Sequence, residues 1–111
     1  MRFEDVAKKV DGIPNMDIRQ GWAVYDHLLR SGAKEVLEIG TAHGVSAAYM
    51  AAAVQENGGK VTTIDGAIPT AERDPAPGDV LARAGLSDVV ERVLVEDSSY
   101  TWWLKQRVEE R

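Results

Sequence analysis

The sequence predicts an α/β fold in which parallel strands alternate with helices. Three short runs of β-type composition, at residues 35–39, 60–64 and 91–95, are separated by segments of helical composition. Alternation of this kind produces parallel pairing through right-handed crossovers. A glycine-containing turn directly after the first run is the second indication, because such turns lead from a buried strand into a helix.

Helices are expected before, between and after these strands. The first covers residues 3–10, and Asp17 caps the second, which ends before Gly32. The later helices are expected at 45–54, at 80–84 after a cap by Asp79, and from Ser99 or Thr101 to Val108. In the second helix the aromatic residues Trp22 and Tyr25 fall on an apolar stripe, which predicts that both are core residues.

These elements assemble into the N-terminal half of a Rossmann-like three-layer sandwich, with strand order 3-2-1 and a helical lead-in. Residues 1–33 are expected to form the lead-in and residues 34–111 a partial Rossmann-like domain, truncated after the third strand and the following helix. A doubly wound domain usually has about six strands. The first strand, at 35–39, is therefore expected to expose an apolar edge, which favours a homo-oligomer or a partner chain.

Composition and charge argue against several classes of protein. The chain has 111 residues and a formal net charge of -5, so the clustered basic face of a nucleic-acid-binding protein is not expected. It has no cysteine and two histidines, so neither a disulfide framework nor a metal site is expected. No apolar run reaches the roughly 18 residues of a spanning helix, and the acidic N-terminus does not resemble a signal peptide. A cytoplasmic location without membrane contact is expected.

Candidate binding residues gather at the carboxyl ends of the predicted strands, where open parallel sheets bind ligands. The first strand ends in the turn 40–44, of sequence GTAHG. Gly40 allows a tight exit from the strand and a close approach of a ligand to the backbone. Gly44 lets the next helix start close to the sheet, and the Ser46 hydroxyl adds to the N–H groups at the start of that helix.

Acidic residues at the next two strand ends complete the predicted site. Asp65 ends the second strand at a spacing that suits a carboxylate accepting hydrogen bonds from both hydroxyls of a ribose. Asp97 and Ser98 follow the third strand, where they would meet the amino edge of an adenine. The alternative is that Asp65 is a solvated strand end and that Asp97 and Ser98 cap the last helix.

The turn differs from the dinucleotide fingerprint G-x-G-x-x-G. Ala42 stands where that fingerprint has its second glycine, which admits the pyrophosphate. Glu38, at the end of the first strand, would repel a phosphate but attract the cationic methionyl end of S-adenosylmethionine. A nicotinamide oxidoreductase is therefore the weaker hypothesis. His43 is expected to be a turn residue that faces solvent or the lead-in helices, and not a catalytic base.

Residues 38–46, of sequence EIGTAHGVS, resemble motif I of class I S-adenosylmethionine-dependent methyltransferases in the version E-x-G-x-x-x-G-x-S. Segments at 13–26, 61–65 and 99–104 are similar to a branch of small bacterial O-methyltransferases. The resemblance places Gly40, Thr41, Gly44 and Ser46 along the methionyl and ribose side of the cofactor, Asp65 at the ribose hydroxyls, and Asp97 and Ser98 beside the adenine. With Glu38 and Ala42, these are the predicted cofactor-binding residues.

The resemblance implies methyl transfer from S-adenosyl-L-methionine to a hydroxyl of a small molecule or sugar. Members of that family continue with a fourth strand and a substrate-binding half, for which this sequence has no matching positions. No catalytic residue is therefore assigned, and the chain is expected to lack activity on its own. The alternative is a non-catalytic nucleotide-binding or interaction module that pairs with a partner chain.

Overall fold

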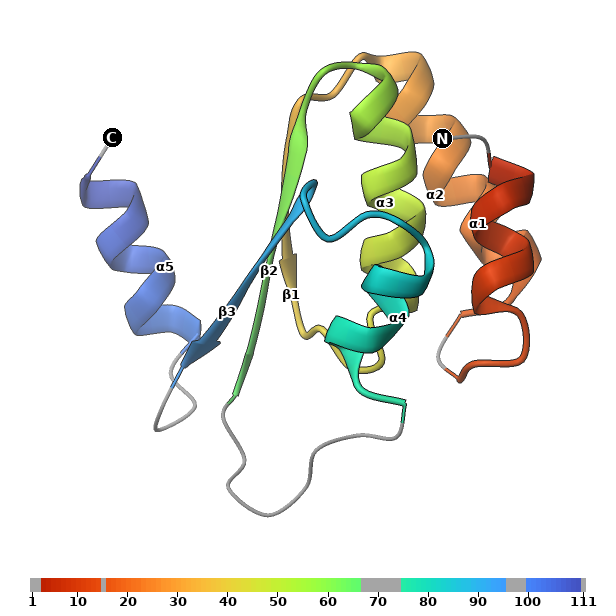
Figure 1. The fold of residues 1–111 in the computed structure, drawn as a ribbon. Helices are drawn as coiled ribbons and strands as arrows, with labels where there is room; N and C mark the ends of the chain where they lie inside the picture. The colour runs from red at the N-terminus through yellow and green to blue at the C-terminus, as the bar shows by residue number, and fades with distance from the viewer. Residues whose placement is uncertain (1–2, 15, 67–74, 96–99, 111) are drawn as a thin grey trace.

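The computed structural model describes residues 3–14, 16–66, 75–95 and 100–110. Its three strands are parallel and form one sheet in the order β1-β2-β3, which confirms the predicted order (Figure 1). The elements in chain order are α1 (Phe3–Val10), α2 (Ile18–Ser31), β1 (Glu35–Ile39), α3 (Val45–Glu56), β2 (Lys60–Gly66), α4 (Pro77–Arg83), β3 (Val90–Val95) and α5 (Tyr100–Glu109).

The sheet lies between two helical layers (Figure 1). One of its faces is covered by α3 and α4, with α1 and α2 packed outside α3, while α5 lies on the opposite face. The α/β class, the Rossmann-like layering and the helical lead-in are therefore confirmed. Among the described residues, none of the helices combines the length and the apolar character that crossing a bilayer requires.

The core is centred on α3, which is buried on both sides. Its middle is rich in alanine, because the sheet and the lead-in helices both approach its axis closely. The buried alanines and valines of α3 are Val45, Ala47, Ala48, Ala51, Ala52, Ala53 and Val54. Side chains of α1, α2 and α4 join the same hydrophobic cluster, so the lead-in and the α/β part share one core. The division into residues 1–33 and 34–111 stays a prediction.

Two local expectations differ from the structure. Helix α4 begins at Pro77, and Asp79 lies in its first turn instead of capping it. The reason is that proline suits the first helical position, where its missing N–H costs no hydrogen bond. Trp22 is not a core residue, because its side chain is 49% exposed. It lies at the rim of an aromatic cluster, in which the centroids of the Trp22 and Phe3 rings are 5.1 Å apart. Tyr25 is buried, as predicted.

Helix α2 lies close against α3 at Gly21. A Cβ atom built on Gly21 would lie 2.5 Å from the ring of Tyr49, which is buried and stacks on Phe3. Gly21→Ala gains about 1 kcal/mol of helix propensity but overpacks a site where such strain costs about 1–3 kcal/mol. We expect a net loss of unfolding free energy, measured by urea denaturation.

Gly78→Ala is the matched control, because Gly78 is also helical. Its added Cβ would meet the end of the exposed Arg92 side chain, with Nη1 at 2.8 Å, and a flexible side-chain end can move away. The unfolding free energy of this variant should rise by about 0.5 kcal/mol. Equal stability changes in the two variants would contradict the close packing of α2 on Tyr49.

Candidate functional site

The turn between β1 and α3 has left-handed backbone at three of its five residues. The φ angles are 93° at Gly40, 50° at Ala42 and 82° at Gly44. The Gly40 amide donates to the Ile64 carbonyl at 2.7 Å, and the Gly44 amide donates to the Thr41 carbonyl at 2.9 Å. The turn is therefore fixed to β2 at its start and closed on itself before α3 begins.

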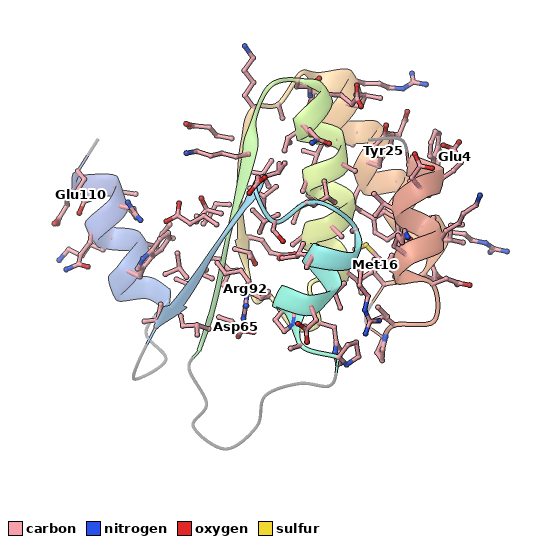
Figure 2. All side chains as sticks on the ribbon, in the orientation of Figure 1. Glu4, Met16, Tyr25, Asp65, Arg92 and Glu110 are labelled. Carbon is pink, nitrogen blue, oxygen red and sulfur yellow. The ribbon has the colours of Figure 1, made fainter. Side chains whose placement is uncertain are left out.

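Asp65 at the end of β2 contacts this turn directly. Its Oδ2 accepts a hydrogen bond from the Ala42 amide at 3.1 Å, and its Oδ1 accepts one from the Gly66 amide at 2.9 Å. Figure 2 shows Asp65 at the end of β2, next to the turn after β1. Left-handed backbone is costly for alanine, and the Asp65 carboxylate stabilises Ala42 in it by accepting its N–H.

Glu38 belongs to a second hydrogen-bonded group beneath the turn. The register of the sheet places Glu38 beside Thr63, on the face that α3 covers. The Thr63 hydroxyl donates to Glu38 Oε1 at 2.6 Å and lies 2.9 Å from the Thr41 hydroxyl. Ser46, in the first turn of α3, also hydrogen-bonds the Glu38 carboxylate. The predicted residues of the strand, the turn and the helix therefore meet at one point.

Burial raises the pKa of Glu38 above its usual value of 4.5. Desolvation is the main cause, because it disfavours the charged form, and the negative charge of Asp65 adds to it. The hydrogen bonds from Thr63 and Ser46 act in the opposite direction, since they stabilise the carboxylate. The site thus holds two carboxyl groups, one of which is partly removed from water.

The far side of the turn packs against the start of α4. A Cβ atom built on Gly44 would lie 3.1 Å from the Cβ of Pro77, so the backbone of the turn fits closely there. Nδ1 of His43 lies 2.9 Å from the carbonyl oxygen of Pro75. The expectation that His43 faces solvent or the lead-in helices is therefore wrong: the ring fastens the turn to the segment before α4.

The predicted site residues fall into two groups. Those that the structure brings together at the carboxyl ends of β1 and β2 are Glu38, Gly40, Thr41, Ala42, Gly44, Ser46 and Asp65. Asp97 and Ser98 lie outside the described residues. Sequence reasoning missed Thr63, which it counted only as a strand former. The signal was available, because Thr63 lies two residues before Asp65 and so shares its face of the sheet.

This geometry defines a class of protein: a Rossmann-like domain whose first strand–turn–helix unit, with the acid at the end of the second strand, forms a site at the carboxyl edge of the sheet. A family model described as a methyltransferase domain matches residues 37–107. That is well over half of the chain, and the chain belongs to this methyltransferase-domain family. Among curated proteins, no sequence matches the chain significantly.

Solved structures with the same fold include several methyltransferases. The O-methyltransferase from Bacillus cereus in complex with SAH matches with a TM-score of 0.69 and 24% identity, over 98% of this chain and 48% of its own. The O-methyltransferase TomG from Streptomyces achromogenes, involved in tomaymycin synthesis and in complex with SAM, matches with a TM-score of 0.62 and 24% identity. The match covers 83% of this chain and 41% of TomG. The SAH-bound methyltransferase PaMTH1 from Podospora anserina matches with a TM-score of 0.64 and 19% identity. The match covers 89% of this chain and 42% of PaMTH1. This chain spans less than half the length of each.

The raised pKa of Glu38 has a consequence for stability. The folded chain keeps this proton at pH values where the unfolded chain has lost it, so stability falls as the pH rises from 4.5 through the raised pKa. Glu38→Gln removes the titrating group and keeps an oxygen that accepts from Thr63. We expect the difference in unfolding free energy between this variant and the wild type to shift in favour of the variant as the pH rises. Urea denaturation between about pH 4 and pH 8 measures this difference.

Glu35→Gln is the control, because Glu35 lies on the same strand but is exposed to water. Its stability should follow the wild-type pH profile. Parallel profiles for Glu38→Gln and the wild type would show that folding does not desolvate Glu38.

Proposed function

We propose that this chain is the cofactor-binding part of an S-adenosylmethionine-dependent methyltransferase that methylates an oxygen of a small molecule or sugar. The observation that carries the proposal is the turn at 40–44, held by Asp65 and flanked by the Glu38 carboxylate. Membership of the methyltransferase-domain family supports the reaction class. The structures solved with SAM or SAH support the choice of cofactor, and the two O-methyltransferases support an oxygen acceptor.

The two glycines of the turn differ in the space around them, and this difference suits a ligand on one side. Among the described residues other than its chain neighbours, none has a heavy atom within 4 Å of a Cβ built on Gly40, whereas a Cβ built on Gly44 would meet Pro77. The backbone at Gly40 is therefore open to a ligand, while Gly44 serves the packing of α3 and α4. A cofactor at the carboxyl edge of the sheet would approach the chain at Gly40.

Asp65 is suited to hold the ribose of this cofactor. Each of its oxygens already accepts one backbone N–H, which fixes the orientation of the carboxylate. Its fixed position at the carboxyl end of β2, beside the turn, suits a carboxylate that accepts hydrogen bonds from ribose hydroxyls.

Glu38 favours an adenosyl ligand with a cationic end over a dinucleotide. A carboxylate that is partly desolvated interacts strongly with nearby charge, because screening by water is reduced. It attracts the methionyl ammonium group and repels a pyrophosphate. When bound, S-adenosylmethionine supplies a methyl group activated by its sulfonium. The residues of this chain bind and orient that group; catalytic residues and the methyl acceptor are not assigned to the described positions.

Binding of S-adenosylhomocysteine to the chain tests the proposal. We expect isothermal titration to give saturable heat with the wild type at up to millimolar ligand, and Asp65→Asn to weaken binding about tenfold or more, because a charged hydrogen bond is worth about 1.5–3 kcal/mol. Asp79→Asn, at an exposed position of α4, is the control and should bind like the wild type. Circular dichroism verifies that all three are folded.

Absence of heat in a folded sample would contradict the proposal. A thermal shift with NADH but not with S-adenosylhomocysteine would favour a nicotinamide oxidoreductase instead.

A second candidate function, a module that assembles through its sheet edge, is favoured by the exposure of β1. Among the described residues β1 pairs only with β2, and its side chains Leu37 and Ile39 are 42% and 52% exposed. The outer strand β3 instead carries exposed charges at Glu91 and Arg92, which protect an edge from pairing.

The occupant that we propose for this edge is the β1 strand of a second copy. Antiparallel pairing centred on Leu37 places Glu35 opposite Ile39 and Val36 opposite Glu38, so no two like charges face each other. The same pairing brings the two copies of Leu37 together, on the face opposite α3.

Cross-linking tests this arrangement, because the chain has no cysteine of its own. Leu37→Cys should form a disulfide-linked dimer on mild oxidation, because the Cα atoms of directly opposing residues in an antiparallel pair are about 4.5–5.5 Å apart. Ile18→Cys, on α2 and also exposed, should stay monomeric. Light scattering that shows a wild-type monomer at every concentration, with a stable melting transition, would contradict assembly through β1.

A further inference from the structure

Thr63 is a fully buried polar residue to which the proposed function assigns no role. Its side chain has 0% exposure, and it lies at the middle of β2 between the last part of β1 and the turn. Its hydroxyl contacts two residues of the candidate site, Glu38 at 2.6 Å and Thr41 at 2.9 Å. This buried hydroxyl therefore connects Glu38 on β1 with Thr41 in the turn.

The hydrogen bonds of this link have a direction. A threonine hydroxyl has one hydrogen and two acceptor lone pairs. The hydrogen of Thr63 is directed to Glu38 Oε1, so the bond with Thr41 must be donated by Thr41. The chain therefore runs from Thr41 through Thr63 to the Glu38 carboxylate, and each donor strengthens the next.

The other charged and polar groups on the elements near Glu38 lie on α3, β2, β3 and the turn. Helix α3 contributes the Ser46 hydroxyl, and the end of β2 contributes the like charge of Asp65. On β3, Arg92 pairs with Thr63 in register and is thus one strand further from Glu38. In the turn, the ring of His43 is bonded to the Pro75 carbonyl. Thr63 and Ser46 are therefore the side chains that stabilise the ionised form of Glu38 against desolvation and Asp65.

We propose that Thr63 is a positioning residue whose hydroxyl orients the Glu38 carboxylate for the ammonium group of the cofactor. The proposal rests on the proposed function, since it assigns the cationic end of the ligand to Glu38. The proposal adds to the candidate site a residue that lies neither in the turn nor at the end of a strand. The contact runs through Glu38, so Thr63 itself does not touch the ligand.

Loss of the Thr63 hydroxyl has two effects that a change of shape does not have. Thr63→Val keeps the branched shape but removes a donor to the carboxylate, so the pKa of Glu38 rises further. It also leaves the buried Thr41 hydroxyl without its acceptor. Thr63→Ser restores the hydroxyl and should restore both interactions.

The first test measures Glu38 without any ligand. Carbon-13 NMR of the glutamate side-chain carboxyls, assigned to Glu38 by its disappearance in Glu38→Gln, gives its titration midpoint. We expect this midpoint to move to higher pH in Thr63→Val and to return to the wild-type value in Thr63→Ser. An unchanged midpoint in a folded Thr63→Val overturns the proposal. Should the valine variant not fold, Thr63→Ala is measured in the same way, with the same two outcomes.

The second test compares two ligands that differ at the amino-acid end. S-adenosylhomocysteine has an ammonium group, whereas 5′-methylthioadenosine has the same adenosine and thioether without it. We expect Thr63→Val to weaken binding of S-adenosylhomocysteine about three- to tenfold near neutral pH and to leave methylthioadenosine unchanged. Thr63→Ser should bind both as the wild type does. Equal weakening of both ligands would show a merely structural role and overturn the proposal.

The two tests separate this proposal from the proposed function. A wild type that binds neither ligand overturns the proposed function and, with it, the assignment of Glu38 to the ammonium group. In that case the NMR midpoints still decide whether the Thr63 hydroxyl interacts with the Glu38 carboxylate. A wild type that binds both ligands, with no selective effect of Thr63→Val, overturns the positioning role alone.

Discussion

The hydrogen bond from the Ala42 amide to the Asp65 carboxylate connects the turn after β1 to the end of β2, and the candidate site depends on it. A turn with three left-handed residues has little stability of its own, because one of the three is an alanine. The carboxylate compensates for that strain and fixes the direction in which α3 leaves the sheet. One side chain thus connects the two strand ends at which the candidate site is formed.

A second constraint concerns charge. Glu38 and Asp65 both lie at the carboxyl edge of the sheet, and Glu38 is partly desolvated there. Two carboxylates in one site destabilise each other unless a cation or several donors balance them. The donors are supplied by hydroxyl groups of Thr63 and Ser46, and by backbone amides at Asp65. This balance favours a cationic ligand over a phosphate.

The sequence predicted the order of the elements, the sheet order and the clustering of the turn with Asp65. These follow from spacing, because a strand that ends in glycine and a strand that ends in an acid bring their carboxyl ends to one edge. The spacing of Thr63 to Asp65 places both on one face of the sheet, but it does not reveal that the Thr63 hydroxyl contacts both Glu38 and Thr41, and Thr63 was counted only as a strand former. The start of α4 was misplaced because Asp79 has the composition of a cap, while Pro77 fits the first helical turn better. The exposure of Trp22 depends on how α1 lies across α2, which helical periodicity cannot supply.

The alanines of α3 set the distance between the sheet and the lead-in helices. With the residues from 47 to 54 buried except Met50, which is half-buried, this helix has almost no outer surface. A larger side chain on it would therefore push apart two layers at once, and with them the strand ends that carry the site. Random mutagenesis of the gene would consequently find α3 nearly closed to replacement, although its middle is remote from the ligand edge. Labels, dyes and affinity tags belong instead on α2 or α5, where side chains such as Ile18 and Val108 face water.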